Sequence, residues 1–190
     1  MRVIAGRFKG RHLQAPKGTD VRPTADRVKE ALFSILGPRI MGARVLDLYA
    51  GTGALGIEAL SRGAVAVTFV EHHPKALRIL RNNLRECGLH DQVEVVAGRV
   101  DDFVARSGTG LPPYHLVLAD PPYEAVAEFA GWGHCIQDGL LTDEGILILE
   151  HAQKSVPTPS IGRLQLVRSY TYGDTALSLY RVRGGVEATA

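Results

Sequence analysis

The sequence predicts an α/β fold built on a mostly parallel sheet of seven strands. Between residues 43 and 150, mostly apolar stretches of strand length alternate with stretches that carry helical apolar spacing. A glycine-rich turn follows the first of these strands. After residue 150, two longer strand-like stretches flank a Gly-Asp pair, which is typical of a hairpin. This alternation favours right-handed βαβ units in a parallel sheet covered on both faces, with an antiparallel hairpin at one edge.

The elements are expected in the following order. A small basic hairpin, extended near residues 2–4 and 12–14, precedes an amphipathic helix that runs from Val28 to Leu36 and stops at Gly37-Pro38. Parallel strands are expected at residues 43–49, 65–71, 93–97, 116–119 and 146–150. Helices are expected at residues 54–62, 74–87, from 101 onward, and within 126–137. The strands 164–172 and 176–182 form the final hairpin.

Length and composition favour one main domain. The chain has 190 residues, of which 45% are hydrophobic, enough for a single core. We expect a basic extension at 1–21, a main domain at 22–183 and a disordered tail at 184–190. No stretch reaches the roughly 20 apolar residues of a membrane span, and Cys87 and Cys135 are too few for a disulfide framework. These features predict a cytoplasmic monomer with free thiols and no membrane contact.

Positive charge is concentrated at the start of the chain. Residues 1–44 carry a net charge of +7, whereas the rest carries −5. This segregation predicts a surface for a polyanion, with Arg7, Lys9 and Arg11 as anchors for nucleic-acid phosphates. A solvated basic arm without a partner is the alternative.

A glycine loop and two acidic residues indicate a nucleotide-like cofactor. Residues 51–56 read G-x-G-x-x-G between a strand and a helix, where the missing side chains allow a ligand to approach the backbone. A dinucleotide-binding dehydrogenase would fit this loop, with Glu71 on the ribose hydroxyls. Asp47, inside the preceding strand, favours S-adenosylmethionine instead, because its carboxylate suits a sulfonium and an ammonium but repels a pyrophosphate.

The tetrapeptide Asp120-Pro121-Pro122-Tyr123 follows the fourth strand, at the sheet edge where open α/β folds bind ligands. The amino group of a base is a poor nucleophile, and acceptors for its hydrogens favour methyl transfer. Asp120 and the Pro121 carbonyl can be these acceptors, with Pro122 keeping the segment rigid. Tyr123 can stack on the base. In the alternative interpretation, Pro-Pro ends a strand and Tyr123 packs in the core.

Three segments carry a resemblance to a known family. They are RPTADRVKEALFSIL at 22–36, VLDLYAGTGALGIEAL at 45–60 and LADPPY at 118–123. Together with the acid at Glu71 they resemble the RsmD family of 16S ribosomal RNA guanine-N2 methyltransferases, over about residues 2–182. The glycine loop and LADPPY occur in many amino-methyltransferases, so the leader and the basic start carry the specificity for this family.

The resemblance implies a class I methyltransferase fold, which is Rossmann-like, and S-adenosylmethionine as cofactor, released as S-adenosylhomocysteine, without a metal. The implied partner is small-subunit ribosomal RNA or a ribosomal assembly particle, and the implied catalytic residues are those of Asp120–Tyr123. The implied cofactor residues are Arg22, Thr24, Asp47, Tyr49, Ala50, Gly51, Gly53, Glu71, Arg99 and Val100. The implied RNA-binding residues are Arg7, Lys9, Arg11, Arg22 and Arg27.

Two details of the sequence complicate the assignment of the family's site residues to this chain. The leader can also be an ordinary helix start, with Thr24 as N-cap and Arg22 and Arg27 solvated. Many class I enzymes read the adenine with an acid after the third strand, but this turn is Gly98-Arg99-Val100. We therefore expect backbone groups of Arg99 and Val100 to contact the adenine, with Asp101 a weaker choice.

Other functions fit parts of the pattern. The nearest alternative is an amino-methyltransferase that acts on adenine N6 in DNA or RNA, or on protein glutamine. A dehydrogenase and a non-enzymatic RNA-binding assembly factor are the alternatives from other classes. The histidines, including His72-His73, lack metal-ligand spacing on a common element, so no metal site is expected.

Overall fold

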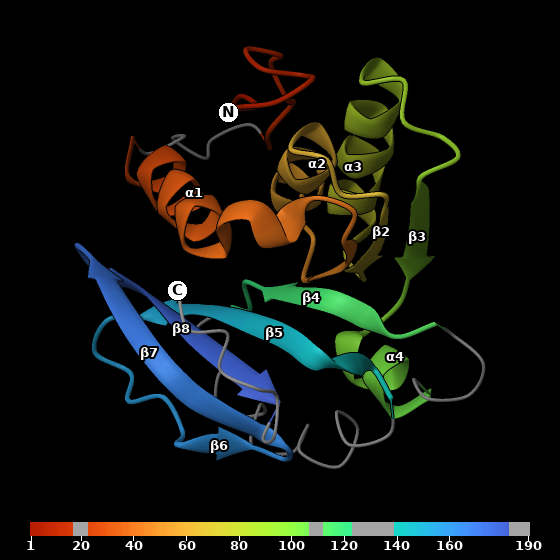
Figure 1. The fold of residues 1–190 in the computed structure, drawn as a ribbon. Helices are drawn as coiled ribbons and strands as arrows, with labels where there is room; N and C mark the ends of the chain where they lie inside the picture. The colour runs from red at the N-terminus through yellow and green to blue at the C-terminus, as the bar shows by residue number, and fades with distance from the viewer. Residues whose placement is uncertain (17–22, 107–111, 123–138, 183–190) are drawn as a thin grey trace. The chain divides into compact units, whose positions relative to one another are not determined.

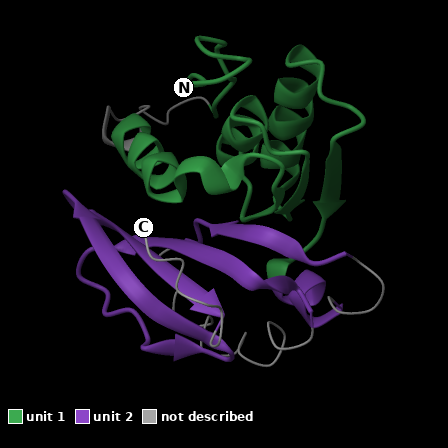
Figure 2. Cartoon of the chain, in the orientation of Figure 1, with its two compact units in different colours: residues 1–100 green, residues 101–190 purple. Residues whose placement is uncertain are grey.

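The structure, a computed structural model, describes residues 1–16, 23–106, 112–122 and 139–182. The chain divides into two compact units, Met1–Val100 (unit 1) and Asp101–Ala190 (unit 2), which Figure 2 colours separately. Unit 1 carries the glycine loop, and unit 2 carries Asp120. The two halves of the expected site therefore lie in different units.

The described part of unit 1 combines three α-helices with a parallel sheet of order β3-β2-β1 (Figure 1). Its elements are α1 (Pro23–Leu36), the 3₁₀ helix η1 (Gly37–Ile40), β1 (Arg44–Leu48), α2 (Ala54–Ser61), β2 (Ala66–Glu71), α3 (Pro74–Glu86) and β3 (Val93–Ala97). Register pairs such as Asp47 with Phe69 and Glu71 with Ala97 bring the carboxyl ends of the strands to one edge. The expected strands of this part and the helices at α2 and α3 are confirmed within one residue at their ends, whereas α1 begins at Pro23, five residues before the expected start at Val28.

Close packing of α2 on β2 explains two of the loop glycines. A Cβ on Gly56 would lie 2.2 Å from Cε1 of the buried Phe69 ring. A Cβ on Gly53, whose φ is +80°, would lie 2.3 Å from the Leu80 side chain of α3. Because real Cβ atoms do not approach so closely, any residue with a side chain at these positions would displace Phe69 or Leu80 from its observed place.

The N-terminal segment forms a hairpin without regular strands. A single antiparallel bridge joins Arg2 to His12, and the apolar side chains of Val3 and Leu13 are buried. The hairpin predicted from the sequence is therefore present. Its arms are joined by backbone hydrogen bonds, from the Val3 N–H to the Arg11 carbonyl oxygen and from the Leu13 N–H to the Met1 carbonyl oxygen, both at 3.0 Å, without a regular strand ladder.

The described part of unit 2 has the strand order β4-β5-β8-β7-β6. Its elements are α4 (Val100–Arg106, which starts at the last residue of unit 1), β4 (Tyr114–Ala119), β5 (Leu141–Ala152), β6 (Ser160–Ile161), β7 (Leu164–Tyr172) and β8 (Thr175–Val182). β4 and β5 are parallel, and the other neighbours are antiparallel. The C-terminal hairpin is confirmed, with Tyr172 paired to Thr175 around the Gly173-Asp174 turn.

Two details of unit 2 differ from the prediction. The described residues contain eight strands rather than seven, because two-residue β6 pairs with the start of β7. β5 begins at Leu141 rather than at residue 146, because Leu141 pairs with Tyr114 before the register shifts. The polar run Thr142–Glu144 at this irregularity reads as a loop in the sequence. The helix expected within 126–137 and the tail expected at 184–190 lie outside the described residues.

Across the described residues, the helices lack the combination of length and apolar composition needed to cross a membrane.

Candidate active site

The turn between β1 and α2 has an unusual backbone. Tyr49 has φ of +59°, the only positive value among the non-glycine residues that the structure describes. Such a backbone is costly for a side-chain-bearing residue and is often found at ligand sites. Gly51 follows with φ of +56°, and a Cβ there would meet no atom closer than the Tyr49 carbonyl oxygen at 3.8 Å. The turn is therefore a strained backbone loop with open space beside it, which fits the approach of a ligand.

Glu71 links this turn to the end of β2. Its Oε2 accepts a hydrogen bond from the Gly51 backbone N–H at 2.8 Å, and its Oε1 accepts one from the His73 N–H at 2.6 Å. The side chain is buried, with 7% of its surface exposed. Each carboxylate oxygen can accept two hydrogen bonds, so this arrangement leaves acceptor capacity for ribose hydroxyls while orienting the turn.

Asp47 has a structural role that the sequence reasoning did not identify. Its Oδ2 accepts the Gly56 backbone N–H at 2.8 Å, and the residue is 2% exposed. The donor that this buried carboxylate requires is thus supplied by the first turn of α2, where the helix dipole also favours a negative charge. The predicted contact of Asp47 with the cofactor's cationic groups stays a prediction.

Asn83 of α3 holds the other side of the glycine turn. Its Nδ2 donates to the Thr52 carbonyl oxygen at 2.9 Å and to the Gln14 carbonyl oxygen at 3.1 Å. Its Oδ1 accepts the Gln14 backbone N–H at 2.8 Å, and the residue is fully buried. One amide therefore fixes both the glycine turn and the end of the N-terminal hairpin. Sequence reasoning missed Asn83, because its partners lie 31 and 69 positions away.

The turn after β3 closes this half of the site. The Gly98 N–H donates to the Glu71 carbonyl oxygen at 3.0 Å, which places the expected adenine-reading turn directly beside the end of β2. Arg99 is exposed, whereas the Val100 side chain is buried with 4% exposure. A contact from Val100 would thus have to come from its backbone, as the sequence analysis expects.

The base half lies at the carboxyl end of β4 in unit 2. Asp120 follows directly after β4 and is exposed, whereas Pro121 is buried and Pro122 is exposed. Surrounding protein atoms displace part of the water around the Asp120 carboxyl and raise its pKa to about 6. The Asp120 carboxyl is thus an acceptor at neutral pH, as the proposed chemistry requires.

A second carboxyl accompanies Asp120. Glu150 lies near the end of β5, and burial together with the charge of Asp120 raises its pKa to about 8. The register pairs Ala119 with Leu149, and Asp120 and Glu150 are the residues that follow this last pair. From the sequence alone, Glu150 is predicted only as the last residue of a strand.

Several predicted site residues are not described in full. Arg22 and Tyr123 lie outside the described residues. α1 begins at Pro23, so Thr24 lies inside the first turn and not at the N-cap position that the alternative interpretation gave it. Arg27 is exposed on α1. Among the described residues, no group of three or more His, Cys, Asp or Glu side chains is arranged to hold a metal ion.

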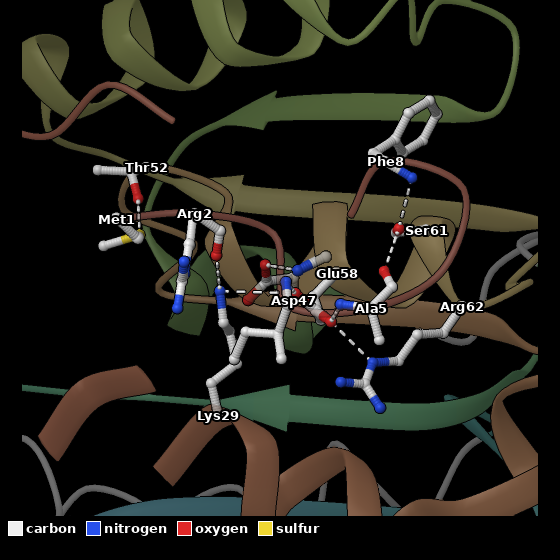
Figure 3. A network of polar contacts seen from close by, with 12 residues as sticks. Met1, Arg2, Ala5, Phe8, Lys29, Asp47, Thr52, Glu58, Ser61 and Arg62 are labelled. Carbon is white, nitrogen blue, oxygen red and sulfur yellow. Dashed lines mark hydrogen bonds and ion pairs between the residues drawn. The ribbon is translucent and has the colours of Figure 1, made fainter. Parts of the chain in front are cut away.

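A buried carboxylate anchors the basic hairpin. Glu58 of α2 is fully buried, and its two oxygens accept the backbone N–H groups of Ile4 at 2.7 Å and Ala5 at 3.0 Å (Figure 3). Lys29 of α1 lies 3.5 Å from Glu58 and donates to the Arg2 carbonyl oxygen at 2.6 Å. The Arg62 Nε lies 2.7 Å from Glu58 Oε1 and forms a second ion pair with this carboxylate. A charged residue inside the otherwise apolar run ALGIEALS was the signal for this role.

The three basic anchors of the hairpin are not equivalent. Arg7 and Lys9 are exposed, and the Arg7 guanidinium lies 5.2 Å from the centre of the Phe8 ring. Arg11 donates through a guanidinium nitrogen to the Glu86 carbonyl oxygen at the end of α3, which is a favourable place for a cation. Arg11 therefore helps to hold the hairpin, while the other two cations face solvent.

The chain is similar to known proteins over nearly its whole length. It matches the family described as "Conserved hypothetical protein 95" over residues 1–181. YlbH of Bacillus subtilis is 38% identical over 97% of this chain and 100% of its own length. Ribosomal RNA small subunit methyltransferase D of Escherichia coli is 34% identical over 100% of this chain and 94% of its own. The Haemophilus influenzae protein of the same name is 35% identical over 95% of this chain and 93% of its own.

Solved structures are also similar to this chain. The Escherichia coli protein yhhF aligns with a TM-score of 0.82 at 34% identity, covering 96% of this chain and 97% of that one. SMU.776, a structure complexed with SAH, shares the fold with a TM-score of 0.70 at 15% identity, covering 85% of this chain and 50% of that one. The fold class expected from the sequence is confirmed. With the family and the relatives matching almost every residue of the chain, it belongs to the RsmD family of ribosomal RNA small subunit methyltransferases.

Proposed function

We propose that this protein transfers a methyl group from S-adenosylmethionine to the exocyclic N2 of a guanine in small-subunit ribosomal RNA. The observation that carries the proposal is the near full-length similarity to ribosomal RNA small subunit methyltransferase D. The geometry of the two site halves supports it, because each half has the groups that one reactant needs.

The cofactor half fits an adenosine with a cationic tail. The open space beside Gly51 and the strained backbone at Tyr49 form a cradle without side chains in the way. Glu71 would bind the ribose hydroxyls, and the Gly98–Val100 backbone would read the adenine. Asp47 lies at the start of the same turn and adds negative charge for the cationic tail. S-adenosylmethionine supplies the methyl group as an electrophilic sulfonium.

The base half fits an amine that must lose its conjugation. Ionised Asp120 would accept hydrogen bonds from the N1–H and N2–H groups of guanine. These bonds favour a tetrahedral N2, whose lone pair is no longer delocalised into the ring. The buried Pro121 places a carbonyl next to it without a competing N–H. In the displacement, the N2–methyl bond forms as the sulfur–methyl bond breaks, and N2 then loses one proton to a carboxylate or to water. In this scheme, the positioning of the two reactants and the electrostatic stabilisation of the transition state account for the rate acceleration.

The basic hairpin supplies the RNA contact. Arg7 and Lys9 are exposed on a segment that Glu58 and Asn83 hold in place. Fixed cations lose little entropy when they meet phosphates, so a clamped hairpin suits a polyanion better than a flexible arm does. Arg22 and Arg27 of the leader are further candidates for this surface.

The test is a methylation assay with S-adenosylmethionine labelled in the methyl group. Purified protein is mixed with small-subunit particles, naked ribosomal RNA, DNA or a protein fraction, and the product base is identified by mass spectrometry. We expect N2-methylguanine in the ribosomal substrates, formed about 10²–10³-fold more slowly by Asp120→Ala. Labelled N6-methyladenine, methylglutamine, or no label at all would refute the proposal.

A further inference from the structure

The neighbouring strands β4 and β5 place two carboxyl groups side by side in unit 2. Parallel pairing runs from Leu116 with Ile146 to Ala119 with Leu149, the last pair of the register. Asp120 comes directly after Ala119, at the end of β4, and Glu150 comes directly after Leu149 in β5. Neighbouring strands lie about 4.8 Å apart, so extending the register by one residue sets Asp120 opposite Glu150. The two carboxyls are close enough that the charge of Asp120 acts on Glu150.

Among the residues that the structure describes, none places an opposite charge beside Glu150 strongly enough to lower its pKa. On the other side, β8 pairs Glu150 with Leu177, which is buried and uncharged. His151 points to the opposite face of β5, where its Nε2 lies 2.8 Å from the Ser178 hydroxyl. Among the described groups, Asp120 is thus the charged neighbour that acts on Glu150.

The two carboxyls consequently take different protonation states at neutral pH. The pKa of Asp120 is raised to about 6 and that of Glu150 to about 8, so the pair holds about one proton, on Glu150, between these values. Such a pair presents an acceptor and a donor next to each other, which two ionised carboxylates cannot do.

We propose that Glu150 is a base-reading residue, whose protonated carboxyl donates a hydrogen bond to guanine O6 while Asp120 accepts from N1 and N2. Guanine presents O6, N1–H and N2–H in a row, an acceptor followed by two donors, and the pair supplies the complementary series. The inference rests on the proposed function and adds a residue that reads the base without touching the reacting nitrogen.

The test is the pH dependence of turnover for the wild type, Glu150→Gln and Glu150→Ala. Activity of the wild type requires ionised Asp120 and protonated Glu150, so it should rise through about pH 6 and fall through about pH 8, leaving about a tenth of its pH 7 rate at pH 9. Glutamine keeps a donor that does not titrate. Glu150→Gln should therefore lose the alkaline fall and keep most of its own pH 7 rate at pH 9.

The alanine variant and a control separate this role from a structural one. Glu150→Ala has no donor and should be about 3- to 10-fold slower than Glu150→Gln at pH 7. Glu144→Gln, an exposed carboxylate on the same strand, should follow the wild-type profile. Calorimetric titration with S-adenosylhomocysteine should give the same affinity for all four proteins, which shows that each one is folded.

Two results would overturn the inference. One is an alkaline fall that persists in Glu150→Gln, and the other is equal turnover of the glutamine and alanine variants. Failure of the proposed function gives a different result. In that case the wild type makes no N2-methylguanine at any pH, which refutes both the proposed function and this inference before any variant is compared.

Discussion

Replacing Glu58 with alanine should destabilise unit 1 strongly. The change leaves Lys29, 5% exposed, as a buried cation without its carboxylate, and it removes the acceptor of the Ile4 and Ala5 N–H groups. Breaking a buried ion pair from one side costs about 3–5 kcal/mol, and hydrogen bonds to a charged group are worth about 1.5–3 kcal/mol each. These losses overlap, so we expect about 3–5 kcal/mol in all. Arg62 is one-fifth exposed, so water can partly replace the carboxylate that it loses.

Urea denaturation followed by circular dichroism measures this loss. With a slope of about 2 kcal/mol per molar urea, the midpoint should fall by about 2 M. Glu86→Ala is the matched control, because Glu86 is an exposed carboxylate that binds the hairpin through Gln14. Its effect should stay within about 0.5 kcal/mol. The double variant Glu58→Ala/Lys29→Met should recover part of the loss, because methionine removes the buried charge.

A loss below about 1 kcal/mol in Glu58→Ala would refute the reasoning. So would a double variant that is less stable than Glu58→Ala by the full cost of a second deletion, since the two residues would then act independently.

Three further predictions concern binding and turnover. Glu71→Ala should weaken S-adenosylmethionine binding by about 1.5–3 kcal/mol, measured by calorimetry, and an unchanged affinity would remove Glu71 from the cofactor site. Replacing Arg7 and Lys9 with glutamine should lower the slope of log RNA affinity against log salt by about 0.7–0.9 for each lost phosphate contact, with cofactor affinity unaltered; an unchanged slope places the RNA surface elsewhere. Asp120→Ala should lower turnover by about 10²–10³ with a smaller effect on the Michaelis constant. An early-melting Asp120→Ala protein that has lost cofactor binding would instead make the residue structural.

Local patterns were sufficient to predict most of the fold. The alternation of strands and helices from residue 43, and the turn at Gly173, follow from spacing within a few residues, and the structure confirms them. The predicted start of β5 was wrong, because the polar run Thr142–Glu144 lies at the register shift between the Tyr114–Leu141 pair and the Leu116–Ile146 pair. Local polarity does not reveal a strand whose pairing is set by a partner nearly 30 residues away.

The site was predictable only in part, for the same reason. The glycine turn and Glu71 are predicted from motifs, and in the structure the Gly51 N–H donates a hydrogen bond to the Glu71 carboxylate. Glu58 and Glu150 were missed, because a charge in a helix or at a strand end is normally solvated. Their roles depend on segments brought to them by the fold, namely the hairpin for Glu58 and β4 for Glu150.

The position of Asn83 has a consequence for mutational studies of this family member. Its amide bonds both to Thr52 in the glycine turn and to Gln14 at the end of the hairpin. A substitution there disturbs two loops with one change, so weaker cofactor binding and weaker RNA binding will be observed together. A saturation screen scored on growth would therefore not assign position 83 to either ligand. Assignment requires a screen that scores the two affinities separately.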